Sequence, residues 1–354
     1  MTAEGRFDMA DAGRAMRADL VPGAVTGIGS LPYTALDDAI ECVLRHTPLL
    51  PAAPQLAQMS PAEGMLAQVI AGVPGLTTDA TGAVVVADAH ALPSPNELDA
   101  AFDPTFEPEV WAGMLAFLDT MAARPRRPAK LQLTGPITLG LALSAAGLTT
   151  TDAFPLALAI VRARSQALVD LTSSWVPATP LVVFLDEPGL VALDGPGFPI
   201  GTDAAIDLLS SALAVFDDST LTGVHCCGPT DWRVAVQAGP DILSLPIDAG
   251  VAGDPAAIAP FLERGGWVAW GVVPTHRPIG EKAEALWRRL VDVWCELTRG
   301  GCDPVLLRRQ ALVTPECGLA LHDPTQVAPV FELAAEVGAR IEDQALACRL
   351  SVGA

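Results

Sequence analysis

A histidine and two cysteines end a short apolar run in the middle of the chain, Leu221-Thr-Gly-Val-His225-Cys226-Cys227-Gly228-Pro229. If this run is a strand, His225 and Cys227 lie on one face and Cys226 on the other, because side chains alternate along a strand. An imidazole and a thiolate on one face are two ligands of the kind that zinc prefers. Cys317, in a second run that ends in a turn (313–319), is a candidate third ligand. The sequence therefore predicts a zinc site.

The elements that must position these residues follow one pattern. Short apolar runs alternate with amphipathic stretches along the chain, which is typical of βα units around a parallel sheet. About eight strands can be counted, so we predict an α/β fold, a single (β/α)8 TIM barrel with an elaborated N-terminal third. The expected strands include 24–31, 129–134, 181–185, the His/Cys run, 242–245, 267–273 and 305–313. The expected helices are 35–46, 109–122, 204–216, 231–238, 255–264, 280–299 and 324–347, with a hairpin near 82–90.

Composition limits the partners and the compartment. We expect residues 1–20 to be a tail, without the apolar core of a signal peptide, and 21–354 to be the barrel. No apolar run approaches the roughly 18 residues of a membrane span, so a membrane is not an expected partner. Seven cysteines without a disulfide framework indicate thiols or metal ligands in a reducing compartment, and we expect a cytoplasmic protein. A net charge of −20 with only two lysines argues against nucleic acid.

Polar residues stand where several of the expected strands end. Because such ends meet at one mouth of a barrel, these residues are candidates for chemistry. Asp186 and Glu187 follow a buried strand, where bare carboxylates are costly unless paired. An ion pair with an arginine is the alternative interpretation, and it fits Glu187 better than Asp186. His276 is either a general acid/base or a residue that lines the mouth. The other candidates are Ser30, Thr134 and Asp248.

Five motifs, taken in order, resemble the catalytic barrel of cobalamin-independent methionine synthases. They are Gly27-Ile28-Gly29-Ser30-Leu31-Pro32, Leu133-Thr134-Gly135-Pro136, Asp186-Glu187-Pro188-Gly189-Leu190, His225-x-Cys227 and Pro315-x-Cys317-Gly318-Leu319. The resemblance spans nearly the whole chain and implies zinc-dependent transfer of a methyl group to the thiol of homocysteine. It implies that His225, Cys227 and Cys317 hold zinc, and that Ile28, Gly29, Ser30, Thr134 and Asp186 bind the amino acid. Zinc suits this chemistry because it removes the proton from a thiol that is otherwise mostly protonated at neutral pH.

Two departures from the family affect the metal and the donor. Where the family has a zinc-binding glutamate, this chain has Pro246, so we predict that Asp248 replaces it or that three protein ligands suffice. In the full-length family an additional N-terminal barrel helps to bind a polyglutamyl folate, and we expect no counterpart of it in this chain. The methyl donor is therefore open between methyltetrahydrofolate and a methylated corrinoid, free or carried by a corrinoid protein.

Other functions are compatible with parts of the sequence. A related zinc methyltransferase would use a different thiol, such as coenzyme M, or pass methyl groups to a corrinoid protein. A metal-free tetrapyrrole decarboxylase would need an arginine-rich N-terminal segment, and the context of Arg14 and Arg17 does not provide one. A non-catalytic barrel that binds an amino acid would need no metal at all.

Overall fold

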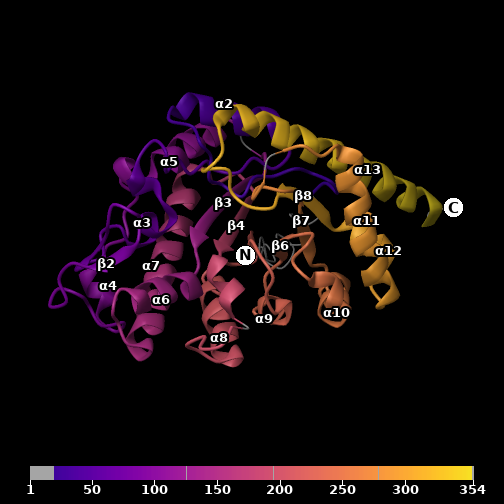
Figure 1. Ribbon diagram of the computed structural model, residues 1–354. Coiled ribbons are helices and arrows are strands. Elements are labelled where there is room, and N and C mark those ends of the chain that lie inside the picture. Colours follow the sequence, from indigo (N-terminus) through magenta and orange to yellow (C-terminus); the bar gives the residue numbers. More distant parts are fainter. Residues whose placement is uncertain (1–19, 125, 194, 278, 353–354) are drawn as a thin grey trace, which may run out of the picture.

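The computed structural model describes residues 20–124, 126–193, 195–277 and 279–352. Its centre is a curled parallel sheet of six strands, which neighbour one another in chain order with helices outside (Figure 1). The strands are β3 (Ala129–Thr134), β4 (Leu181–Asp186), β5 (Thr220–His225), β6 (Ile242–Pro246), β7 (Trp267–Val273) and β8 (Ala311–Pro315). Since all six are parallel, their C-terminal ends meet at one edge, which we call the mouth.

Helices connect these strands and cover the outside of the sheet. They are α2 (Leu36–His46), α3 (Met65–Ile70), α4 (Leu98–Ala101), α5 (Pro108–Ala122), α6 (Pro136–Ala145), α7 (Thr150–Trp175), α8 (Thr202–Leu213), α9 (Trp232–Gln237), α10 (Pro255–Glu263), α11 (Ala283–Arg299), α12 (Pro304–Arg309) and α13 (Val327–Val352). Short 3-10 turns lie at Pro61–Glu63, Pro188–Ala192, Val251–Gly253 and Pro324–Gln326. The strand–helix alternation confirms the predicted α/β class.

The predicted eight-stranded barrel is confirmed only in part. Six regular strands form, and two further segments lie between β8 and β3, joined by the isolated parallel bridges Val25–Val313, Ser30–Gln55 and Ala52–Lys130. The predicted first strand, 24–31, is one of these segments. The other contains Pro51 and Pro54, whose nitrogens cannot donate to a ladder. Regular pairing therefore stops at the prolines.

The N-terminal third is elaborated as predicted. Between α3 and α4 a two-stranded antiparallel hairpin forms from β1 (Leu76–Thr78) and β2 (Val84–Val86), slightly before the predicted 82–90. Arg164 of α7 anchors this region. Its buried guanidinium donates to the carbonyls of Ala71 and Thr105 and lies 5.6 Å from the ring of Trp111.

One predicted strand began in the wrong place. Residues 305–309, expected to start a strand, belong to α12, and β8 begins only at Ala311. Asp303 explains the helix, because its carboxylate accepts a hydrogen bond from the Val305 N–H (2.7 Å) and Pro304 occupies the first helical position.

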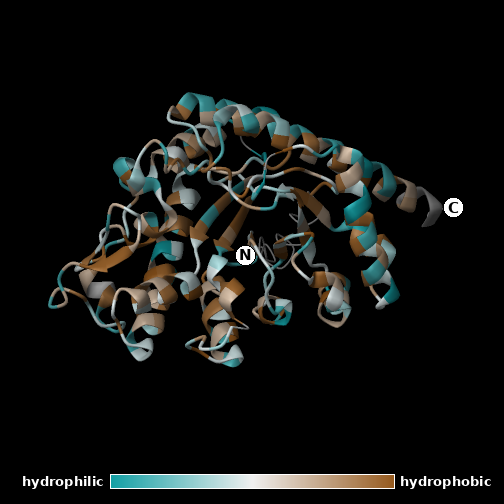
Figure 2. Ribbon diagram, in the orientation of Figure 1, coloured by the Kyte–Doolittle hydropathy of each residue, from teal (hydrophilic) through white to brown (hydrophobic). Residues whose placement is uncertain are grey.

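Two apolar layers hold the sheet in place. One lies between the sheet and the helices, and Figure 2 shows hydrophilic residues along the visible sides of α2, α11 and α13. The other fills the inside of the curl and includes Phe184 and Leu20. Apart from Leu20, the predicted tail 1–20 lies outside the described residues. Within the described residues, no helix is both long and apolar enough to cross a membrane.

Gly223 shows how tightly the inside of the curl is packed. A Cβ at this position would lie 1.6 Å from two carbons of the Phe184 ring on the neighbouring strand. Only glycine leaves room for that ring, and Lys130 of β3 lies over it, with Nζ 4.7 Å from the ring centroid. The Phe184 ring of β4 therefore packs against both neighbouring strands, β3 and β5.

Candidate active site

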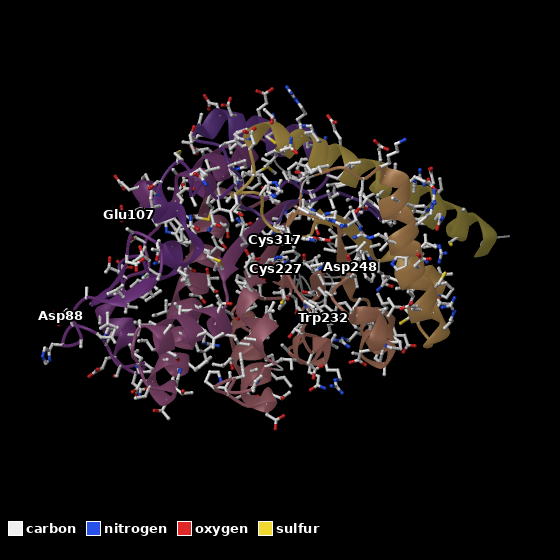
Figure 3. The ribbon with its side chains drawn as sticks, in the orientation of Figure 1. Asp88, Glu107, Cys227, Trp232, Asp248 and Cys317 are labelled. Atoms are coloured by element: carbon white, nitrogen blue, oxygen red, sulfur yellow. The ribbon has the colours of Figure 1, made fainter. Side chains whose placement is uncertain are left out.

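Two of the three cysteine and histidine ligands predicted from the sequence are in contact at the mouth. Cys227 follows β5 and Cys317 follows β8 by two residues each, and Figure 3 shows them side by side. The side chains of Cys227 and Cys317 interact, and this interaction lowers the pKa of Cys227 to about 7 and raises that of Cys317. Cys226 points the other way and is fully buried in the layer under the helices, and burial raises its pKa to about 12. The predicted position of Cys226 in the layer under the helices is confirmed.

His225, the predicted imidazole ligand, ends β5. Its Nδ1 lies 3.0 Å from the Ser244 hydroxyl of β6, while Nε2 is buried and has no hydrogen-bond partner among the described residues. Burial lowers the pKa of His225 to about 3, and the positive charge of Lys130 adds to the effect. The ring is therefore neutral at physiological pH, the form in which histidine binds metals. In metal-binding histidines, one ring nitrogen typically contacts a polar group that orients the ring, and the other nitrogen binds the metal. The arrangement of His225 matches this pattern.

These residues fit zinc by the chemistry of their donors. Two thiols in contact and a neutral imidazole nitrogen without a partner are a Cys2His set, which with one further position suits tetrahedral zinc. Across the described ranges, however, no three His, Cys, Asp or Glu side chains are grouped so that they could hold an ion. The structure thus brings together the sulfurs but does not group the imidazole with them.

Asp248 was predicted as a substitute for the family glutamate. Its side chain is 63% exposed, and its carboxylate forms an ion pair with Arg289 of α11 at 3.0 Å. Figure 3 shows it displaced from the two sulfurs. Arg289 also pairs with Glu281 at 2.9 Å. Metal binding by Asp248 would require it to leave this arginine.

The predicted acceptor loop lies against Cys317. A Cβ on Gly318 would come 1.8 Å from the Ser30 hydroxyl oxygen, and the Leu319 N–H donates to the Ser30 carbonyl at 2.8 Å. Gly29 needs to be glycine because its φ is +143° and Gln132 lies against it. A small hollow separates the loop from the β8 turn; its lining includes Ile28, Gly29, Ser30, Cys317 and Phe331.

Asp186 lies at the end of β4, in register with His225. Its Oδ1 is buried without a hydrogen-bond partner in the described part of the chain. Burial raises its pKa to about 7, and the charge of Lys130 opposes the rise. Lys130 is itself fully buried, and its ammonium donates to the Ile28 carbonyl at 2.6 Å and to Gln132 Oε1 at 3.2 Å.

Thr134 and Glu187 have defined partners within the protein. The Thr134 hydroxyl donates to the Met65 carbonyl at 2.7 Å. Glu187 is fully buried and accepts hydrogen bonds from the N–H groups of Ile137 (2.9 Å) and Thr138 (2.7 Å) and from the Thr138 hydroxyl (2.6 Å). The Glu187 carboxylate thus caps the first turn of α6. The ion pair with an arginine, which was the alternative interpretation, does not form among the described residues.

His276 follows β7 at the mouth. Its side chain is 67% exposed, and its Nδ1 lies 3.0 Å from Oε2 of Glu316, which is almost fully buried. The other oxygen of Glu316 has no hydrogen-bond partner within the described chain and lies 3.9 Å from Arg289.

Sequence reasoning missed Lys130 and Glu316. The signal for Lys130 was present, since Lys130, Gln132 and Thr134 alternate with apolar Ala129, Leu131 and Leu133. Such alternation predicts a polar inner face. Glu316 gave no signal, because its role depends on residues of distant strands and helices.

Comparison with solved structures shows which known fold this chain shares. No family model and no curated sequence matches the chain. A B12-independent methionine synthase from Shewanella sp. W3-18-1, solved in complex with selenomethionine, matches with a TM-score of 0.61 over 93% of this chain and 100% of that chain, at 15% identity. The fold is that of the B12-independent methionine synthases. A putative vitamin-B12-independent methionine synthase from Listeria monocytogenes agrees, with a TM-score of 0.57, 12% identity and coverage of 92% and 98%. These matches confirm, at the level of fold, the resemblance that the motifs indicated.

Proposed function

We propose that this chain is a zinc-dependent methyltransferase that moves a methyl group to the thiol of homocysteine and forms methionine. The main support is the contact between Cys227 and Cys317, from strand ends far apart in sequence, beside the Ser30 loop. The Shewanella structure contains selenomethionine, an analogue of the product that we propose. Free thiols at the site are compatible with the reducing cytoplasm.

We assign zinc to Cys227, Cys317 and Nε2 of His225. When bound, zinc would supply the acidity that turns the acceptor's thiol into a thiolate at neutral pH. Ser244 would keep the His225 ring oriented through Nδ1. Three protein donors would leave one position for the substrate, as in catalytic rather than structural zinc sites.

The protein's own residues would bind the acceptor and manage protons. The Ile28–Ser30 loop and Asp186 would hold the carboxylate and ammonium groups of homocysteine beside the sulfurs. The acceptor would give up its S–H proton to water, and its sulfur would form the new bond to the methyl carbon. The bond between methyl group and donor breaks, and its electron pair stays with the donor. If the donor is a folate, we propose that His276 gives a proton to the folate nitrogen from which the methyl group leaves. Glu316 would hold the His276 ring in place.

The donor we favour is methyltetrahydrofolate. The relatives are described as independent of B12, which argues against a corrinoid or a corrinoid protein as partner. In the test, zinc-loaded protein is incubated with homocysteine and one methyl donor. The donors, assayed in parallel, are monoglutamyl methyltetrahydrofolate, polyglutamyl methyltetrahydrofolate and methylcobalamin. Methionine formed only from the folate supports this donor, and methionine formed only from methylcobalamin would reverse the assignment.

Zinc content tests the site independently of turnover. We expect about one zinc per chain in the wild type, and loss of it in Cys227→Ser and in Cys317→Ser. Cys295→Ser is the matched control, because Cys295 is exposed on α11. Wild-type protein purified without zinc, or Cys227→Ser that keeps it, would refute the assignment.

A second candidate is a barrel that binds an amino acid without catalysis. It is favoured by the ungrouped imidazole in the described structure and by Pro246 in place of the family glutamate. Tight binding of homocysteine, with neither zinc nor turnover under any donor, would support this candidate over the enzyme.

A further inference from the structure

We propose that Gln132 is a positioning residue of the acceptor site, which holds the Ile28–Ser30 loop through side-chain hydrogen bonds that replace those of a regular strand. Lys130 acts with it by orienting its side-chain amide. This inference rests on the proposed function, and it adds the residues that set where the loop stands beside Cys317.

A gap in the sheet separates β3 from the segment that contains Pro51 and Pro54. One isolated bridge joins them, in which the Lys130 N–H donates to the Pro51 carbonyl and the Ala53 N–H donates to the Lys130 carbonyl, both at 2.8 Å. In a regular parallel ladder the next bond would join the Gln132 N–H to the Ala53 carbonyl. Because the bridge is isolated, that carbonyl needs another donor. It accepts from Nε2 of the Gln132 side chain at 2.9 Å.

Lys130 determines how the Gln132 amide is oriented. Lys130 has no solvent exposure, and its ammonium can only donate hydrogen bonds, so the amide oxygen must face it. Nζ of Lys130 lies 3.2 Å from Oε1 of Gln132 and also donates to the Ile28 carbonyl at 2.6 Å. The NH2 group of Gln132 is thereby turned toward Ala53. Lys130 and Gln132 together join β3 to both segments that lie between β8 and β3.

The Gln132 amide also lies directly against the loop. Gly29 has a φ of +143°, and a Cβ there would lie 2.5 Å from Nε2 of Gln132. The amide therefore fills the space that this glycine leaves open. At its other end the loop is fixed by the turn after β8, where the Leu319 N–H donates to the Ser30 carbonyl at 2.8 Å. Loss of the Gln132 amide would free one side of the loop and leave Cys317 untouched.

Calorimetric titration of the zinc-loaded protein with methionine tests the proposal. Gln132→Met keeps the length of the side chain but removes its hydrogen bonds, and it should weaken methionine binding about tenfold, because a carbonyl loses its donor and the loop loses an anchor. In turnover the KM for homocysteine should rise by a similar factor, while kcat at saturation stays within about twofold. Zinc content should stay at the wild-type value. Gln166→Met, at an exposed position whose amide donates to Asp170 at 3.0 Å, should leave all of these quantities unchanged.

Hydrogen exchange locates the effect without any ligand. In Gln132→Met the amides of residues 27–31 should exchange about tenfold faster than in the wild type, whereas those of β5 and β6 should not change. Gln132→Ser also removes the hydrogen bonds without adding bulk, and it should give the same pattern if Gln132→Met folds poorly. Lys130→Met should weaken methionine binding too. Because Lys130 acts partly through Gln132, the double variant should weaken binding by less than the product of the two single effects.

Three results would overturn the inference while the methyltransferase stands. The first is methionine binding, or exchange of residues 27–31, that both Gln132 variants leave unchanged. The second is faster exchange throughout the sheet together with loss of zinc, which would show a purely structural role. The third is a double variant whose effect equals the product of the single effects, which would contradict the role of Lys130. If the wild type does not bind methionine, the proposed function fails and the inference fails with it.

Discussion

Replacing Gly223 by alanine should destabilise the protein strongly, because the Phe184 ring occupies the space of the missing side chain. The added Cβ would lie 1.6 Å from ring carbons, whereas ordinary van der Waals contact begins at 3.4 Å. The ring must therefore move by about 2 Å in an interior packed as densely as an organic crystal. Phe184 has no solvent exposure, so it cannot move outward into water.

The expected loss follows from the size of this overlap. Overpacking a core costs typically about 1–3 kcal/mol and sometimes more. Because the clash is between a strand backbone and a rigid ring rather than a flexible chain end, we expect about 3 kcal/mol or more.

Urea unfolding measures the effect. Gly253→Ala is the matched control, because a Cβ there would meet no described atom within 4 Å, and we expect a change within about 0.5 kcal/mol. Phe184→Leu in the Gly223→Ala background should recover part of the loss, so the double mutant should be more stable than additivity predicts. A Gly223→Ala protein as stable as the Gly253→Ala control, or strict additivity with Phe184→Leu, would refute this account of the packing.

Three further predictions concern single side chains. Glu187→Ala should lower the free energy of unfolding by about 3 kcal/mol, since three hydrogen bonds to a buried carboxylate are lost; Glu336→Ala, at an exposed helix position, should be near neutral in the same urea titration. Arg164→Leu should cost about 2 kcal/mol and speed proteolysis of the segment that it anchors, and an unchanged cleavage pattern would contradict that role. In metal-free protein, the rate at which Cys227 is alkylated, followed by mass spectrometry, should be half-maximal near pH 7. The reason is the lowered pKa of Cys227, since the reactive thiolate predominates above that pH and is protonated below it. Cys317→Ala should shift this midpoint upward, and a midpoint that stays in place would show that the sulfur contact does not set it.

Much of the fold could be predicted from local pattern. The bounds of β3 and β7 agree with the expected strands, because each run ends directly before a glycine or a proline. The start of β8 could not be placed, since the apolar residues 305–307 suit a buried helix as well as a strand. The segment that contains Pro51 and Pro54 was not predicted as a strand for another reason. Prolines interrupt its pairing, which is limited to isolated bridges with Ser30 and Lys130.

The site was predictable where it depends on strand ends. Cys227 and Cys317 are brought together because parallel strands end at one mouth, which the sequence alone implies. The ion pair between Asp248 and Arg289 could not be predicted, since it joins the loop after β6 to a helix 41 residues further on. Lys130 was missed because its partners Ile28 and Asp186 come from other strands, although the alternation along β3 indicated an inward-facing polar residue.

The capping of α6 by Glu187 has a consequence for anions. The start of a helix, with its free N–H groups and partial positive charge, is where many α/β proteins bind phosphate. Here the N–H groups of Ile137 and Thr138 are already satisfied by a carboxylate of the chain itself. A phosphate or carboxylate arriving at this corner would meet a negative charge instead of free donors. Negatively charged parts of a substrate would therefore find no free donors among these N–H groups.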